Sequence, residues 1–264
     1  AAQRAVLLDP DLAEGWASWG VLAFEADRDW TTAELALKRA VALKPSYAWA
    51  RASLGDMLRL QGRVQEAIEQ QRMALELDPL SPQSHSTLGL SLLVAGQWEE
   101  ARMQYEASAA SGGETGALPT FMTSGAEMGL TADEIAEHAV QFARVMGACD
   151  PEAARVLGPA LAGGSLDEEL AATALESVAT LIADSVLTLQ MIAGLYTKLG
   201  DHDTALDWLE TLTAGGSLSA GIVGVDPALD PLRGYPRMQA LMDGLGLPNG
   251  YDPAADTYEP EGTP

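Results

Sequence analysis

Apolar positions in the segment Ala48–Pro79 recur three and four residues apart, in two runs separated by Gly62. This spacing places apolar side chains on one face of a helix, and a glycine between two such runs is typical of a turn. Small residues stand at Gly55 and Ala67, where two packed helices approach to about 8–10 Å. Proline then ends the pattern at Pro79, because proline does not continue a helix. The segment is therefore predicted to be a helical hairpin.

The same pattern returns along the chain at intervals of 34 or 35 residues. Gly55 recurs as Gly89, and the turn at Gly62 recurs as Gly96. The residues that close successive units are Pro10, Pro45 and Pro79. The extra residue of the longer interval is placed in the turn Asp27–Thr32, where insertions are tolerated. We expect a leading half-repeat and three regular hairpins within residues 1–113, at Leu12–Pro45, Ser46–Pro79 and Ser81–Ala110.

Beyond residue 113 the repeat weakens, while helical spacing continues. Thr131-x-x-Glu134 and Ser165-x-x-Glu168 match the capping box that opens a helix, so divergent hairpins are expected in residues 114–183. The helices expected there are Leu118–Met128, Ala132–Met146, Pro151–Leu161 and Leu166–Ala183. The segments expected after them are a repeat-like hairpin at 184–216 with its turn at Gly200, capping helices at 217–250 and an acidic, disordered tail at 251–264.

Leu54-Gly55-x2-Leu58, with Ala67 and Pro79 in register, resembles the tetratricopeptide repeat (TPR). The resemblance implies an all-α fold, a right-handed superhelical solenoid of antiparallel helical hairpins. It also implies a scaffold for protein–protein interaction, in which the first helix of each hairpin lines the concave surface.

Helical spacing predicts which side chains reach that concave surface. The expected peptide-binding groove consists of Glu14, Ala17, Val21, Phe24, Trp49, Ala52, Asp56, Arg59, Gln83, Ser86, Leu90 and Leu93. TPR domains of the co-chaperone type bind a C-terminal carboxylate with lysine, asparagine and arginine on these faces. This chain has Ala17, Val21, Asp56, Gln83 and Thr87 in the corresponding places, which argues against such a clamp. Trp49 is either the binding anchor or a residue that packs on the neighbouring hairpin.

The segment Pro231–Leu241, followed by Gly246-Leu247-Pro248, resembles the closing part of certain bacterial TPR regions. Those regions lie behind winged-helix transcription regulators, adenylate or guanylate cyclase domains, or protein kinase domains. Met238 stands where these relatives often have phenylalanine. Since the sequence also starts without methionine and inside a predicted helix, Gln3–Asp9, we expect the C-terminal sensory or regulatory segment of a larger bacterial signalling or transcription-regulatory protein.

Charge is large and uneven in this chain of 264 residues, whose net charge is −23. Residues 1–110 hold 10 Lys and Arg against 15 Asp and Glu, whereas residues 111–264 hold 5 against 23. Such a surface repels phosphate backbones, so direct binding of nucleic acid is not expected. It favours basic or neutral protein partners, although the acidity has an alternative explanation in solubility.

The location predicted for the chain is cytoplasmic. Cys149 is the single cysteine, so no disulfide framework is possible within the chain. The longest apolar stretch, Ala179–Tyr196, is interrupted by Asp184, Ser185 and Gln190. It therefore predicts two amphipathic helices and no membrane insertion. The oligomeric state stays open.

Residues with catalytic or metal-binding chemistry do not form a recognisable motif. His85 occupies the repeat position of Trp16 and is interpreted as structural, and His138 has no second histidine at ligand spacing. Asp201-His202-Asp203 is explained by helix capping. We therefore expect no enzyme, no cofactor and no metal. The alternative is an enzyme-associated helical domain with a small-molecule or catalytic site in residues 114–183.

Overall fold

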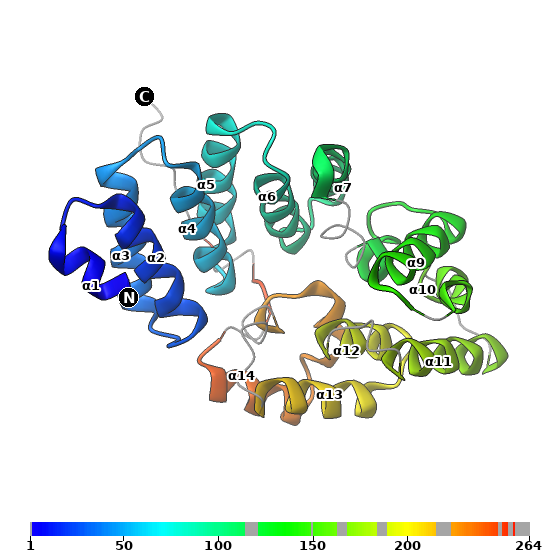
Figure 1. Cartoon of the computed structure of the whole chain (residues 1–264). Helices are drawn as coiled ribbons and strands as arrows, with labels where there is room; N and C mark the ends of the chain where they lie inside the picture. Colours follow the sequence, from blue (N-terminus) through cyan, green and yellow to red (C-terminus); the bar gives the residue numbers. More distant parts are fainter. Residues whose placement is uncertain are drawn as a thin grey trace.

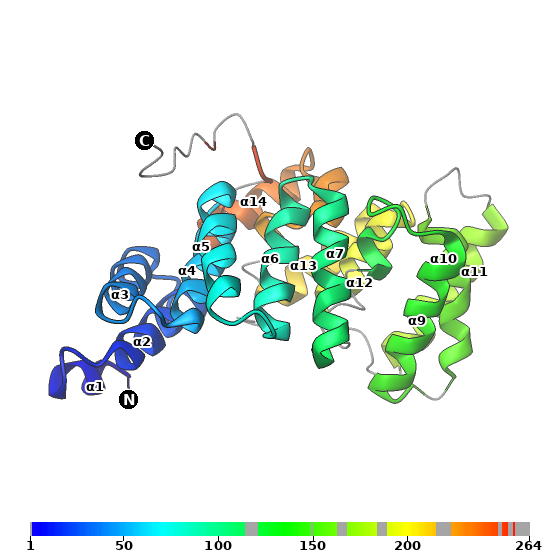
Figure 2. The same cartoon turned by 90° about the horizontal axis from the view of Figure 1, so that it is seen from above.

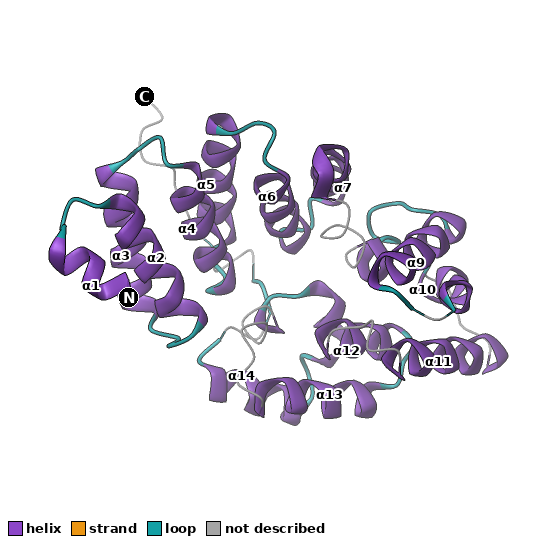
Figure 3. Cartoon of the chain, in the orientation of Figure 1, coloured by secondary structure: helices purple, strands orange, loops and turns teal. Residues whose placement is uncertain are grey.

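The structure is a computed structural model. The residues that it describes are 2–113, 121–148, 150–162, 168–183, 189–214, 223–247, 250–252 and 256. These residues form helices, turns and loops, with no strand among them (Figure 3). The class is all-α, as the sequence predicted, and the architecture is a solenoid of antiparallel helical hairpins.

The first half of the chain contains the regular hairpins. Their helices are α1 (Ala2–Leu8), α2 (Ala13–Glu25), α3 (Trp30–Leu43), α4 (Ala48–Leu60), α5 (Val64–Leu77), α6 (Pro82–Val94) and α7 (Trp98–Ser108). The predicted turns at Gly62 and Gly96 are confirmed, since these residues have positive φ angles of 78° and 70°. Arg28, in the longer turn between α2 and α3, has a φ of 53°, which is unusual for a residue other than glycine.

A glycine on the first helix sets the distance to the second helix in each regular hairpin. A Cβ atom on Gly55 would lie 2.6 Å from Cγ of Gln71 and 3.0 Å from the carbonyl oxygen of Ala67. Gly55 and Ala67 are therefore the close approach that the sequence predicted. The equivalent pairs in the three hairpins are Gly20–Leu37, Gly55–Gln71 and Gly89–Tyr105.

The middle of the chain is helical but no longer follows the repeat. Its elements are the π-helical turn η1 (Ala109–Gly113), α9 (Ala132–Met146), the 3-10 helix η2 (Pro151–Val156), α10 (Leu157–Leu161) and α11 (Glu168–Ala183). Thr131 forms the predicted capping box with Glu134. The predicted box at Ser165 lies outside the described residues.

The helix expected at Leu118–Met128 ends earlier than predicted. Among its described residues, 121–124 are helical, and residues 125–129 form a turn that ends at Gly129, whose φ is 78°. The described part of this segment therefore differs from the prediction. Ser124-Gly125 explains the early end, because neither residue favours a helix interior.

The last part of the chain returns to a hairpin. Its elements are α12 (Leu189–Lys198), α13 (His202–Ala214), the 3-10 helix η4 (Pro227–Leu232) and α14 (Pro236–Leu245). Gly200, with a φ of 85°, makes the predicted turn. The first residues of the predicted capping segment 217–250, up to residue 222, lie outside the described residues.

The chain follows a curved path, and its C-terminal helices lie on the inner side of the curve (Figure 1). Figure 2 shows the row of hairpins from above, with α12–α14 behind α5–α7 and partly hidden by them. Met122 shares an apolar cluster with Ile192, and Lys198 forms an ion pair with Glu127. These contacts hold the returning helices against the middle of the chain.

Candidate functional site

The predicted groove residues lie on α2, α4 and α6, four on each helix. The three first positions, Glu14, Trp49 and Gln83, are exposed. Trp49 is 42% exposed, which is large for a tryptophan. This end of the face, near the N-termini of the first helices, is therefore open to solvent.

An aromatic and charged patch surrounds Trp49. The ring of Tyr47 lies 5.9 Å from that of Trp49, and Nζ of Lys44 lies 5.0 Å from the centroid of the Tyr47 ring. Lys44 also donates a hydrogen bond to Glu14 over 2.7 Å, and this bond lowers the pKa of Glu14. Glu14, Lys44, Tyr47 and Trp49, which we call the Trp49 patch, therefore form one connected surface with its charges paired.

Four apolar residues of the predicted groove are buried in the core. Ala17 is 0%, Leu93 is 3%, Ala52 is 5% and Phe24 is 6% exposed. The prediction that they face a ligand does not fit this structure, because the first helices of neighbouring hairpins pack directly on one another, α2 on α4 and α4 on α6. Phe24 stacks on Trp30, with centroids 6.4 Å apart. These side chains therefore belong to the packing between helices and are not accessible to a ligand.

The middle of the face contains a polar network on α4 and α5. Nη2 of Arg59 and Nε2 of Gln71 donate to Oδ1 of Asp56 over 3.5 and 3.3 Å. Burial raises the pKa of Asp56, while Arg59 and Gln71 oppose that rise. Arg59 is only 5% exposed, so its guanidinium contacts the buried carboxylate of Asp56 and is not accessible to a ligand. The other three predicted positions, Val21, Ser86 and Leu90, are half-buried.

The acidic residues on this face are mostly engaged with neighbouring side chains. Glu14 pairs with Lys44, and Asp56 is held by Arg59 and Gln71. Glu25 is exposed at the end of α2, and no ion pair with it is recorded among the described residues. Although the residue as a whole is exposed, partial burial of its carboxyl group and the nearby charge of Asp56 raise the pKa of Glu25.

The position of His85 has the same role in each regular hairpin. Its Nε2 lies 3.1 Å from the carbonyl oxygen of Pro79, which closes the preceding unit. Because a carbonyl only accepts, Nε2 carries a proton. The three equivalent contacts are Trp16 Nε1 to Pro10 O at 2.8 Å, Arg51 Nε to Pro45 O at 3.1 Å and His85 Nε2 to Pro79 O at 3.1 Å. His85 is therefore structural, as predicted.

The other candidate residues are also engaged in structural contacts. Asp201 accepts a hydrogen bond from the backbone N–H of Thr204, and Nδ1 of His202 lies 3.0 Å from the hydroxyl of Tyr235. The ring of His138 stacks on Phe121 at 4.5 Å. Within the described ranges, no group of three His, Cys, Asp or Glu residues is placed to hold a metal. Cys149 lies outside those ranges.

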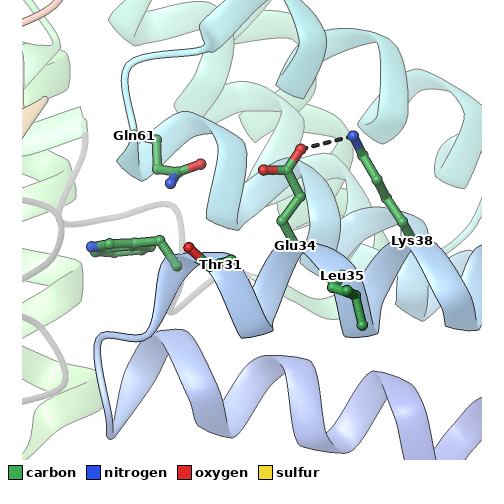
Figure 4. A pocket seen from close by; sticks show the side chains of 6 residues that line it. Thr31, Glu34, Leu35, Lys38 and Gln61 are labelled. Atoms are coloured by element: carbon green, nitrogen blue, oxygen red, sulfur yellow. Dashed lines mark ion pairs between the residues drawn. The ribbon is translucent and has the colours of Figure 1, made fainter.

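A surface hollow of about 450 Å³ lies between α3 and the turn that follows α4. Figure 4 shows the side chains that line it, with Glu34 paired to Lys38. Glu34 also pairs with Arg63 at 2.9 Å. Since its charged groups satisfy one another and Leu35 is 61% exposed, the hollow has no evident chemistry.

Comparison with known families identifies the repeats of this solenoid. A tetratricopeptide repeat model matches residues 20–84, and a second tetratricopeptide repeat model matches residues 82–107. The chain therefore contains tetratricopeptide repeats, matched over residues 20–107.

Two solved structures are similar to this chain. One is a mutant of the O-GlcNAc transferase of Thermobaculum terrenum, with a TM-score of 0.46, 21% identity, and coverage of 52% of this chain and 26% of that one. The other is pilF of Pseudomonas aeruginosa, with a TM-score of 0.42, 21% identity, and coverage of 83% and 84%. No curated protein matches the chain.

Proposed function

We propose that the chain binds an extended protein segment along the face of α2, α4 and α6, with Trp49 as its anchor. The repeats themselves indicate a scaffold with protein partners. The observation that supports this particular face is the exposure of Trp49, which is 42% accessible although it lies on a helix packed on both sides. Large aromatic side chains of this kind contribute most of the binding energy in many interfaces.

The ligand that fits best is neutral or basic. The whole chain carries a net charge of −23, which attracts basic segments over a distance. Close to the Trp49 patch the acidic groups are mostly paired, so apolar contact with the tryptophan supplies affinity and the wider field supplies selection.

The role that we propose for this binding is sensory or regulatory, within a larger bacterial signalling or transcription-regulatory protein in the cytoplasm. The support is the resemblance of the segment Pro231–Leu241. In the structure this segment is a packed closing element, where Leu232 and Met238 are fully buried. The sequence upstream of Ala1 tests the proposal, which predicts an effector domain there.

In the described part of the chain no helix is long and apolar enough to cross a membrane. The helices α9, η2, α10 and α11, where a catalytic site was the alternative, pack around an apolar cluster that includes Ile135, Leu157 and Leu181. Scaffold packing explains these residues without a reaction.

Peptide selection on the intact chain tests the proposed function. A library of twelve-residue peptides is displayed and selected, and the tightest binder becomes the probe peptide. Replacing Trp49 with alanine should weaken its binding by about 2 kcal/mol, roughly 30-fold. Leu35→Ala is the control, because Leu35 is also exposed but lies on α3, outside this face.

A melting curve accompanies each binding measurement. If Trp49→Ala lowers the melting temperature by several degrees and leaves probe binding unaltered, Trp49 is a packing residue and the proposed anchor is wrong. Equal losses of binding in both variants would mean that the peptide recognises another surface.

A further inference from the structure

The inner face of the regular hairpins is partly covered by residues from the C-terminal end of the chain. Val225 belongs to the same apolar cluster as Leu93, and both Leu90 and Tyr251 pack against that cluster. Leu90 and Leu93 are two of the predicted groove positions. The C-terminal residues therefore share one apolar cluster with the α6 end of the predicted groove, where Leu90 is half-buried.

Hydrogen bonds to one residue, Gln65 at the start of α5, hold this cover in place. The backbone N–H of Gln65 donates to Oδ2 of Asp256 over 2.9 Å. Its side-chain amide donates to the hydroxyl of Tyr251 over 3.3 Å, and that hydroxyl donates to Asp256 over 3.2 Å. The three residues therefore form a closed triangle of hydrogen bonds, which joins the start of α5 to two residues near the C-terminus.

The helix α5 has a specific need for this carboxylate. The first N–H groups of a helix have no acceptor within it, and the side chain of Arg63 at the N-cap, which can only donate, does not cap them. By contrast, Asp29 caps α3 and Thr131 caps α9 from within their own sequences. Asp256 supplies the acceptor that α5 lacks, and its charge is favoured by the helix dipole.

Gly250, directly before Tyr251, has a backbone conformation that favours glycine. Its φ is +99°, a conformation that residues other than glycine rarely adopt, and its N–H donates to the carbonyl oxygen of Gly224 over 2.8 Å. A Cβ atom there would lie 3.5 Å from Nε of Arg233, whose guanidinium is held by the carbonyl oxygens of Val223 and Asp226. Gly250 and Arg233 are therefore both fixed by hydrogen bonds to backbone carbonyl oxygens.

We propose that Gly250, Tyr251, Asp252 and Asp256, which we call the C-terminal strap, compete with the ligand for the inner face and so regulate its binding. This inference rests on the proposed function. The recorded contacts of the strap with α5 are a few hydrogen bonds and one half-buried aromatic ring, so it opens without unfolding of the hairpins. A ligand that spans the whole face displaces it.

Asp256→Ala in the intact chain tests the strap with two readouts. The first is hydrogen exchange of the Gln65 amide, which has no acceptor inside α5 and is protected by Asp256. Its exchange should accelerate toward that of an exposed amide. The second is binding of the probe peptide, which should tighten by up to about fivefold, since one hydrogen bond no longer holds the strap closed.

Glu76→Ala is the matched control, because it removes one exposed negative charge from α5. For a basic probe peptide, loss of a negative charge alone weakens binding. If the strap competes with the peptide, Asp256→Ala should instead tighten peptide binding. The two variants therefore separate the effect of lost charge from the effect of an opened strap.

Each result of this experiment decides one point. Unchanged exchange at Gln65 would show that the strap is not latched, and faster exchange without tighter binding would show that it does not cover the binding face; either result overturns the proposal. If no probe peptide depends on Trp49, the proposed function itself fails and the strap has no ligand to regulate, while exchange at Gln65 still reports whether the latch closes.

Discussion

The regular hairpins of residues 13–108 and the irregular helices of residues 121–183 bring helices together by different means. The regular hairpins repeat the same two contacts. A glycine of the first helix faces a fixed position on the second helix, and a side-chain N–H of the first helix donates to the carbonyl oxygen of the proline that closes the preceding unit. A sequence with such a period reveals its contacts, because each one is seen three times.

The irregular helices use contacts that occur once. Gly158 of α10 lies against the backbone of α9, where a Cβ atom would overlap the carbonyl oxygen of Ala132 and lie 2.5 Å from Cβ of Ala136. No repeated sequence pattern predicts this contact. The comparison shows that periodicity makes a contact predictable from sequence without making it stronger.

The largest expected effect belongs to this single contact. Gly158→Ala forces a methyl group against backbone atoms that have no room to move, so it should lower the free energy of unfolding by about 3 kcal/mol or more. Chemical denaturation measures it. Gly244→Ala is the control, because Gly244 lies in α14 with no atom within 4 Å of the added methyl, and there alanine should stabilise the helix by up to about 1 kcal/mol. Similar stabilities of the two variants would contradict the close approach of α9 and α10.

The second effect tests the repeated contact. Ala67 is fully buried beside Gly55, and Ala67→Leu adds carbon atoms where α4 and α5 touch. The expected loss is about 1–3 kcal/mol, less than for Gly158, because side chains such as Gln71 adjust more readily than backbone. Ala42→Leu on the exposed side of α3 should have almost no effect. A thermal melt of Ala67→Leu that matches the parent would refute the predicted register of the hairpin.

Sequence reasoning therefore succeeded where the chain repeats itself. It located the hairpins, the glycine turns at Gly62, Gly96 and Gly200, the capping box at Thr131 and the structural role of His85. It placed Ala17 and Phe24 on the groove because helical spacing defines a face but does not show that neighbouring first helices cover it. It predicted a disordered tail at 251–264 and did not foresee the contact of Asp256 with Gln65, since that hydrogen bond has no local signal in either segment.

A smaller effect concerns the hydrogen bonds that close each unit. Trp16→Phe keeps an aromatic ring but removes the donor to Pro10, and it should cost about 1 kcal/mol, the usual net contribution of one hydrogen bond. His85→Phe removes the donor to Pro79 and also the contact of Nδ1 with Oε1 of Gln104 at 2.8 Å, so it should cost about 1–2 kcal/mol. Denaturant midpoints of both variants check this. A loss in only one of them would mean that the contact is not a shared feature of the repeats.

The smallest effect is a pH dependence in the irregular part. Burial lowers the pKa of His138, while Glu134, Glu137 and Glu106 oppose that change. Because the pKa of His138 is lower in the folded than in the unfolded state, the unfolded chain binds more protons below about pH 6.5. Stability from this group is complete above that pH and declines as the pH falls toward the lower folded pKa.

Thermal melts of the parent and of His138→Gln, between about pH 7.5 and about pH 5.5, isolate this contribution, since the carboxylates titrate alike in both proteins. The parent should lose more stability on acidification than the variant, by less than about 1 kcal/mol, because the half-buried ring is partly screened by water. Nδ1 of His138 is buried and makes no hydrogen bond in the described structure, so no acceptor there rewards protonation. Parallel pH profiles would mean that the ring, despite its stacking on Phe121, remains as well hydrated as in the unfolded chain.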